Sequence, residues 1–118
     1  MARPIAVKRA YDPPAPDDGV RVLVDRLWPR GLTKEKAAVD AWMRDIAPST
    51  ELRQWFHRDR TQWAEFERRY RRELDTPEKG ALLTQLKSLS RKGKLTLLYG
   101  AKERDRNHAT ILAEVLSG

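Results

Sequence analysis

The sequence contains no cysteine, two histidines and no long apolar run, and each shortage excludes a kind of protein. Without cysteine there is no disulfide, no thiol nucleophile and no thiolate zinc site. Two histidines without an HExxH motif do not form a histidine metal site, so we expect no metal. Binding of Mg²⁺ by oxygen ligands is an alternative that the sequence does not exclude. No apolar run approaches the roughly 20 residues of a membrane-spanning helix. The first residues, MARPIAVKR, lack the apolar core of a signal peptide, so we expect a cytoplasmic protein without a membrane partner.

Motifs that would name a reaction are also missing. There is no glycine-rich phosphate loop, no nucleophile elbow and no dinucleotide fingerprint, and Gly100 is a lone glycine. The residues therefore leave open which reaction the protein catalyses, if any, and which cofactor it uses.

The composition favours one compact domain with a basic surface. A chain of 118 residues is long enough for a single core, so residues 1–118 are expected to form one domain. Only 40% of the residues are hydrophobic, but four tryptophans add area that can be buried. The net charge is +7, from 24 Lys and Arg against 17 Asp and Glu. Such an excess favours anionic partners, such as nucleic acid, nucleotides or phosphate esters, or it serves solubility alone.

Three segments have the pattern of strands. Ile5–Lys8 alternates apolar and polar residues, which is typical of a half-exposed strand. Val20–Val24 and Leu95–Tyr99 are nearly continuous apolar runs, typical of strands buried on both faces. Between the first two, Asp12–Gly19 contains three prolines and a glycine and is expected to be a loop.

Five segments have the pattern of helices, and their cap residues mark where they begin and end. The expected helices are one capped by Thr33, with Val39, Trp42, Met43 and Ile46 on one face and Pro48 at its end; one capped by Ser49; one from Thr61 with Trp63, Phe66, Tyr70 and Leu74 in a stripe; one from Thr76-Pro77 to Gly93; and one capped by Asp105 or Asn107. The sequence thus predicts a small α/β domain with a short, mainly parallel sheet of about three strands covered by about five helices. Its core is expected to include Trp42, Trp63, Phe66, Leu86 and Leu112.

The long helical crossover between the two apolar strands predicts the location of a site. Such a connection makes the strands parallel, so their carboxyl ends lie at one edge of the sheet, where ligands bind in α/β folds. The free N–H groups at the start of the last helix favour an anion at the same edge. We therefore predict an anion-binding pocket formed by Arg26, Arg30, Lys102, Asn107 and His108, with Asp25, Trp28 and Arg104 as accessory residues. His108, at its mouth, could act as an acid or base.

Structural explanations stand beside this hypothesis. Arg26 and Arg30 could pair with neighbouring aspartates, and Trp28 could belong to the core. His57, in WFHRD, is most simply a residue at the boundary between two helices. The basic run Arg68–Arg72 could form ion pairs with Glu65, Glu67 and Glu73 on a solvated helix face, or it could follow nucleic-acid phosphates.

The segments KRAYDPP, GVRVLVDRLWPRGL, APSTELRQWF and LTLLYGAK, in this order, resemble the YeaO-like branch of the domain of unknown function 488 family. The resemblance spans nearly the whole chain and implies a small α/β domain, with no assigned function. The wider group carries a Cys-His-Arg triplet after its last strand, where this chain has Arg106, Asn107 and His108. Cysteine-dependent activity therefore does not carry over, although anion-binding geometry does.

These observations lead to one functional hypothesis and two alternatives. The first is a small cytoplasmic protein that binds a phosphate- or carboxylate-bearing small molecule at the carboxyl edge of its sheet. The alternatives are a basic protein associated with nucleic acid, and an interaction module without a ligand. No helix-turn-helix spacing is visible, so sequence-specific DNA recognition is not expected. The oligomeric state is not indicated.

Overall fold

The computed structural model describes residues 5–118 as an α/β domain built on a four-stranded sheet. The strands are β1 (Ala6–Arg9), β2 (Val20–Leu23), β3 (Ala41–Trp42) and β4 (Leu95–Tyr99). Their order is β1-β4-β2-β3, and every neighbouring pair is parallel. Val22 pairs with Leu97 on one side and with Ala41 on the other. The predicted parallel pairing of the two apolar strands is confirmed.

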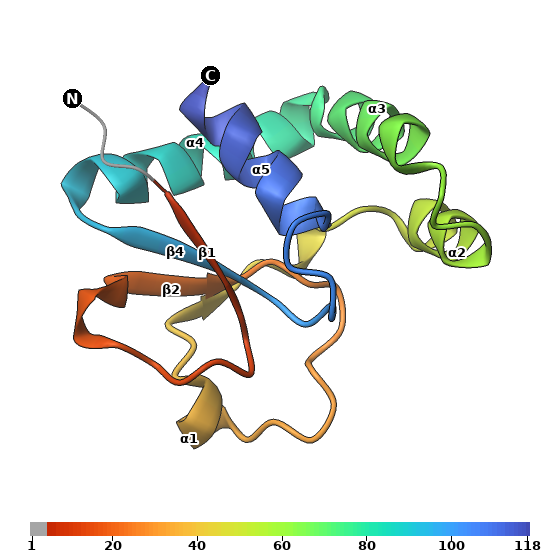
Figure 1. Ribbon diagram of the computed structural model, residues 1–118. Helices are drawn as coiled ribbons and strands as arrows, with labels where there is room; N and C mark the ends of the chain where they lie inside the picture. Colours follow the sequence, from red (N-terminus) through yellow and green to blue (C-terminus); the bar gives the residue numbers. More distant parts are fainter. Residues whose placement is uncertain (1–4) are drawn as a thin grey trace.

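Five α-helices surround the sheet, as predicted. They are α1 (Lys34–Ala37), α2 (Thr50–Arg58), α3 (Trp63–Leu74), α4 (Pro77–Lys92) and α5 (His108–Ser117), with 3₁₀ turns at Pro16–Asp18 and Arg44–Ile46. The side chains of Ser49, Thr76 and Asn107 accept hydrogen bonds from the first turns of α2, α4 and α5, as their sequence positions indicate. Figure 1 shows α3, α4 and α5 over one face of the sheet and α1 beyond the other. Within residues 5–118, no helix is both long and apolar enough to cross a membrane.

The alternation of side chains along the central strands divides the core between the two faces of the sheet. Val22, Leu95 and Leu97 belong to a large cluster beneath α3, α4 and α5, whereas Leu23 and Leu98 belong to a small one on the other face. Three of the residues expected in the core, Phe66, Leu86 and Leu112, are buried, and Trp42 and Trp63 are partly buried.

The helix predicted from Thr33 to Pro48 is wrong. α1 ends after one turn because Ala38 adopts a left-handed conformation with φ of 48°. The chain then forms β3, and Met43, directly after it, donates its backbone N–H to the carbonyl oxygen of Leu23. The four apolar residues of the expected stripe do not share a face: Val39 and Trp42 pack in the small cluster, and Met43 and Ile46 in the large one.

A buried ion pair fixes α1 beneath the sheet. Arg21 is 4% exposed, and its Nη1 lies 2.5 Å from Oδ2 of Asp18. The same guanidinium donates to the carbonyl oxygens of Ala37 and Ala38, at the end of α1. Burial opposes ionisation of Asp18, but hydrogen bonds from the N–H of Ala15, from Lys8 and from Arg21 together hold the pKa of Asp18 below its usual value.

Candidate functional site

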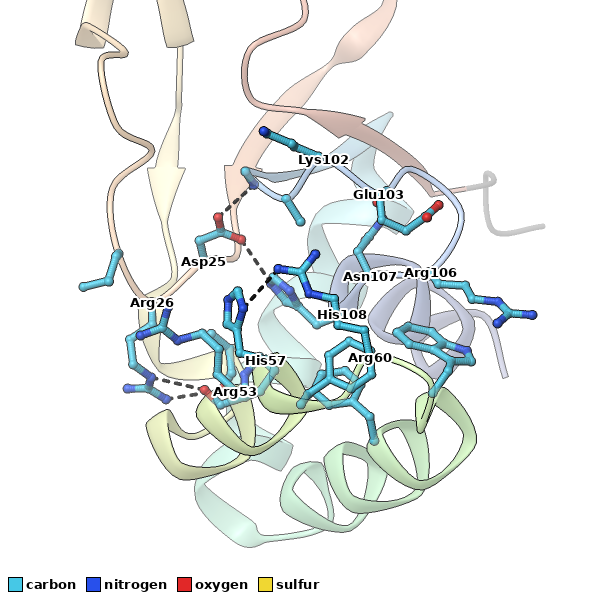
Figure 2. A pocket seen from close by; sticks show the side chains of 18 residues that line it. Asp25, Arg26, Arg53, His57, Arg60, Lys102, Glu103, Arg106, Asn107 and His108 are labelled. Atoms are coloured by element: carbon cyan, nitrogen blue, oxygen red, sulfur yellow. Dashed lines mark hydrogen bonds and ion pairs between the residues drawn. The ribbon is translucent and has the colours of Figure 1, made fainter.

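A cavity of about 670 Å³ lies where the central strands end. The end of β2, the loop after β4, the start of α5 and one side of α2 and α3 enclose it (Figure 2). Its lining residues are Asp25, Arg26, Leu27, Ala47, Pro48, Arg53, Phe56, His57, Arg60, Trp63, Phe66, Gly100, Ala101, Lys102, Glu103, Arg106, Asn107 and His108. The volume is in the range of pockets that hold drug-sized ligands.

Asp25 joins three of the elements that form this cavity. Its Oδ2 accepts a hydrogen bond of 2.8 Å from the N–H of Gly100, directly after β4. Its Oδ1 lies 3.2 Å from Nε2 of His108, at the start of α5. A Cβ atom at Gly100 would lie 2.9 Å from Asp25 Oδ2, so a larger residue at this position would displace the Asp25 carboxylate. Asp25, predicted as an accessory residue, thus holds the cavity together.

His108 and Asn107 occupy the start of α5. Nε2 of His108 lies 2.9 Å from the carbonyl oxygen of Val24, which can only accept, so this nitrogen carries a proton. Asn107 is 4% exposed; its Oδ1 caps α5, and its Nδ2 donates to the carbonyl oxygens of Glu103 and Arg104. Asn107 therefore shapes the loop that borders the cavity, and its own hydrogen-bonding groups are occupied.

The opposite wall carries basic residues that the sequence analysis did not select. In Figure 2, Arg53, His57 and Arg60 extend from α2 and the turn after it toward Asp25 and His108. Nη2 of Arg60 lies 3.0 Å from Nδ1 of His57. The Nε of Arg53 is buried and has no hydrogen-bond partner among the described residues. The spacing i, i+4 places Arg53 and His57 on one face of α2, whereas Arg60 follows the end of the helix and carries no periodic signal.

Aromatic rings form the apolar part of the wall. Phe56, Trp63 and Phe66 line the cavity, and their ring centroids lie between 4.5 and 5.8 Å apart. Phe66 is buried, whereas Phe56 and Trp63 keep part of their surface exposed. In the predicted stripe on α3, Tyr70 and Leu74 are therefore buried in the core, whereas Trp63 and Phe66 line the cavity.

The cavity is electropositive. Five of its lining side chains are cations and two are carboxylates: Arg26, Arg53, Arg60, Lys102 and Arg106 against Asp25 and Glu103. Lys102 and Arg106 are exposed and extend outward from the rim in Figure 2. Such a field raises the local concentration of anions.

The structure brings four of the five predicted anion-binding residues to this cavity: Arg26, Lys102, Asn107 and His108. The guanidinium of Arg26 donates to the carbonyl oxygens of Ala47 and Pro48, each at 3.2 Å. This residue therefore also fixes the segment before α2.

Arg30, the fifth of these residues, is not among those that line the cavity. Trp28 packs edge-on against Trp42 in the small core cluster and donates its indole N–H to the carbonyl oxygen of Leu32. This packing draws the loop toward the α1 face, leaving Arg30 exposed. Trp28 is thus a core residue, and Arg104, the other accessory residue away from the cavity, pairs with Asp12 at 2.9 Å.

The basic run on α3 is largely paired. Arg68 and Arg69 both contact Glu65, and Arg71 contacts Glu67 and Glu114. These contacts match the interpretation of the run as a solvated ion-pair face. Among residues 5–118, no group of three or more His, Asp or Glu side chains has the arrangement of a metal site.

The comparison with known proteins identifies the family. A family model described as the inactive DUF488-N3 subclade matches residues 4–118. The chain belongs to this family. It is 46% identical to the uncharacterized protein YeaO of Escherichia coli K12 over 112 residues, covering 95% of this chain and 96% of YeaO. It is 40% identical over 114 residues to the uncharacterized protein Rv3073c of Mycobacterium tuberculosis H37Rv, covering 97% and 94% of the two chains. The resemblance drawn from VDRLWPRG and the other segments is confirmed, and no solved structure matches the chain.

Proposed function

We propose that this protein binds a small anionic molecule in the cavity between the strand ends and α2. The observation that carries the proposal is the excess of cations in the lining: Arg26, Arg53 and Arg60 on the cavity and Lys102 and Arg106 at its rim, against two carboxylates. These side chains come from separate segments of the chain and gather around one partly open cavity, so their fields add at one place.

The environment of Arg53 supports the proposal. Buried donors in folded proteins are nearly always paired, and one that is unpaired calls for an explanation. The Nε of Arg53 is such a donor, and its guanidinium has no carboxylate partner among residues 5–118. A guanidinium has the planar geometry that binds phosphate and carboxylate through two parallel hydrogen bonds. An anionic ligand would supply the acceptors that the fold does not.

Two observations favour binding over catalysis. The family model that matches the chain describes its subclade as inactive. In addition, the groups nearest the strand ends hold one another in place, because Asp25 accepts from the Gly100 N–H and Nε2 of His108 hydrogen-bonds to the carbonyl oxygen of Val24. Groups that are held in fixed contacts are better suited to binding a ligand than to transferring a proton to it.

Thermal unfolding in phosphate and in chloride at equal ionic strength tests the proposal. Bound ligand stabilises the native state, so phosphate should raise the melting temperature of the wild type. The double variant Arg53→Gln/Arg60→Gln should lose this gain because it lacks the two guanidinium groups on the α2 wall.

A charge-matched control distinguishes an effect of the cavity on the phosphate response from an effect of the net charge of the protein. Arg30 and Arg91 are exposed and lie outside the cavity, so Arg30→Gln/Arg91→Gln removes the same charge elsewhere. It should keep the phosphate response. Equal losses in both double variants, or no response in the wild type, would contradict the proposal. Steeply salt-dependent binding to duplex DNA in place of a phosphate response would instead favour the alternative of a nucleic-acid-associated protein.

A further inference from the structure

The cavity combines two kinds of wall that a simple oxyanion would not need. The guanidinium groups of Arg53 and Arg60 and the rings of Phe56 and Trp63 all line it. Both rings are partly exposed, and their centroids lie 5.8 Å apart. Partly exposed aromatic faces beside cations are the elements with which proteins bind the bases and phosphates of unpaired nucleotides.

The size of the cavity supports a ligand larger than phosphate. A volume of about 670 Å³ is typical of sites that enclose drug-sized molecules. A phosphate ion beside Arg53 and Arg60 would leave the aromatic wall without a partner. A planar ring joined to an anionic group would contact both walls at once.

We propose that the ligand is a nucleoside monophosphate, whose phosphate binds the guanidinium groups of the α2 wall and whose base packs against Trp63 and Phe56. This inference rests on the proposed function, because it names the class of anion that the same cavity binds. The cavity is bordered on several sides by α2, α3, α5 and the loop after β4. It therefore fits a single nucleotide better than a strand of nucleic acid, which needs an extended groove.

The test compares ligands that differ by one part, using calorimetric titration of the full chain at fixed ionic strength. Adenosine 5′-monophosphate and ribose 5-phosphate carry the same phosphate ester, so a difference in affinity between them measures the contribution of the base. We expect the nucleotide to bind about tenfold more tightly, which is within the range of base–aromatic stacking. Adenosine, without the phosphate, should bind far more weakly than the nucleotide.

Variants assign each part of the ligand to its wall. Trp63→Leu should remove the advantage of the nucleotide over ribose 5-phosphate while leaving the affinity for ribose 5-phosphate unchanged. Trp63→Phe, which keeps an aromatic face, should retain most of the advantage. If Trp63→Leu does not fold, Phe56→Leu serves the same purpose. Arg53→Gln/Arg60→Gln should weaken both phosphorylated ligands together.

The outcomes separate this inference from the function on which it rests. Equal affinities for the nucleotide and ribose 5-phosphate would overturn the inference and leave anion binding intact. If neither phosphorylated ligand binds and phosphate itself has no effect, the proposed function fails. Octathymidylate that binds at least tenfold more tightly than thymidine 5′-monophosphate would also overturn the inference, because the source of the nucleotide would then be a nucleic-acid strand.

Discussion

Nε2 of His108 lies 3.2 Å from Oδ1 of Asp25, so the first residue of α5 contacts the second residue after β2. The other carboxylate oxygen accepts from the N–H of Gly100, after β4. One side chain therefore joins three segments that are distant in the sequence. The position of the candidate site depends on this junction.

Replacing Asp25 tests the junction. Asp25→Ala removes the acceptor for the partly buried Gly100 N–H, and leaving this donor unpaired should cost about 1 kcal/mol. Asp25→Asn retains an oxygen for this N–H and should lose less of the free energy of unfolding. Urea unfolding of the two variants measures the difference. Equal losses for alanine and asparagine would mean that the bond to Gly100 is not what stabilises this edge.

The pair of Asp18 and Arg21 predicts a dependence of stability on pH. Because the pKa of Asp18 is lower in the folded chain than its unfolded value of about 3.9, ionised Asp18 stabilises the fold above that pH. This contribution is lost as the pH falls through the folded pKa. Removing one partner of a buried pair costs about 3–5 kcal/mol at neutral pH, so Asp18→Asn should be strongly destabilised there.

The difference in free energy of unfolding between the wild type and Asp18→Asn should shrink as the pH is lowered from 6 toward 3. Asp17→Asn, at the exposed neighbouring position, is the matched control and should differ little from the wild type throughout. A difference that stays constant over this range would show that protonation of Asp18 is not linked to folding.

Tyr70 ties α3 to the segment that precedes α2. Its hydroxyl donates a hydrogen bond of 2.7 Å to the carbonyl oxygen of Ile46, and burial raises the pKa of the phenol, so the donor stays protonated. Tyr70→Phe keeps the ring but leaves this carbonyl unpaired. We expect a loss of about 1–3 kcal/mol in chemical denaturation. A loss below about 0.5 kcal/mol would show that water replaces the hydroxyl.

We expect Arg53 to lower the free energy of unfolding of the protein when no anion is bound. Its Nε is a buried donor without a described partner, so Arg53→Met, which keeps an unbranched stem, should raise the free energy of unfolding by about 1 kcal/mol in chloride. The same variant should show a smaller stabilisation by phosphate. A destabilised variant with an unchanged phosphate response would mean that Arg53 serves the fold.

The elements that the sequence predicted well are those whose signals are local. The strand Leu95–Tyr99 and the caps Ser49, Thr76 and Asn107 depend on patterns of a few residues, and all are present. The segment from Thr33 to Pro48 was mispredicted because its apolar spacing fits a helix, although its side chains pack on opposite faces of the sheet. Only the tertiary packing separates Val39 and Trp42 from Met43 and Ile46.

Only part of the candidate site could be predicted from the sequence, because the rest depends on tertiary packing. Parallel strands place their ends at one edge, which brought Asp25, Lys102 and His108 to one cavity. The direction of a loop is not encoded in this rule, so the exposed position of Arg30 could not be foreseen. The contribution of α2 was also missed, because where Arg53 and Arg60 lie depends on how α2 packs beyond the strand ends.

The most direct measurement for the account is a crystal structure of the protein in phosphate. We predict tetrahedral electron density inside the cavity, within hydrogen-bond distance of the guanidinium groups of Arg53 or Arg60 and lost in Arg53→Gln/Arg60→Gln. A cavity that contains only water, with phosphate bound at Arg30 or along α3 instead, would contradict the account.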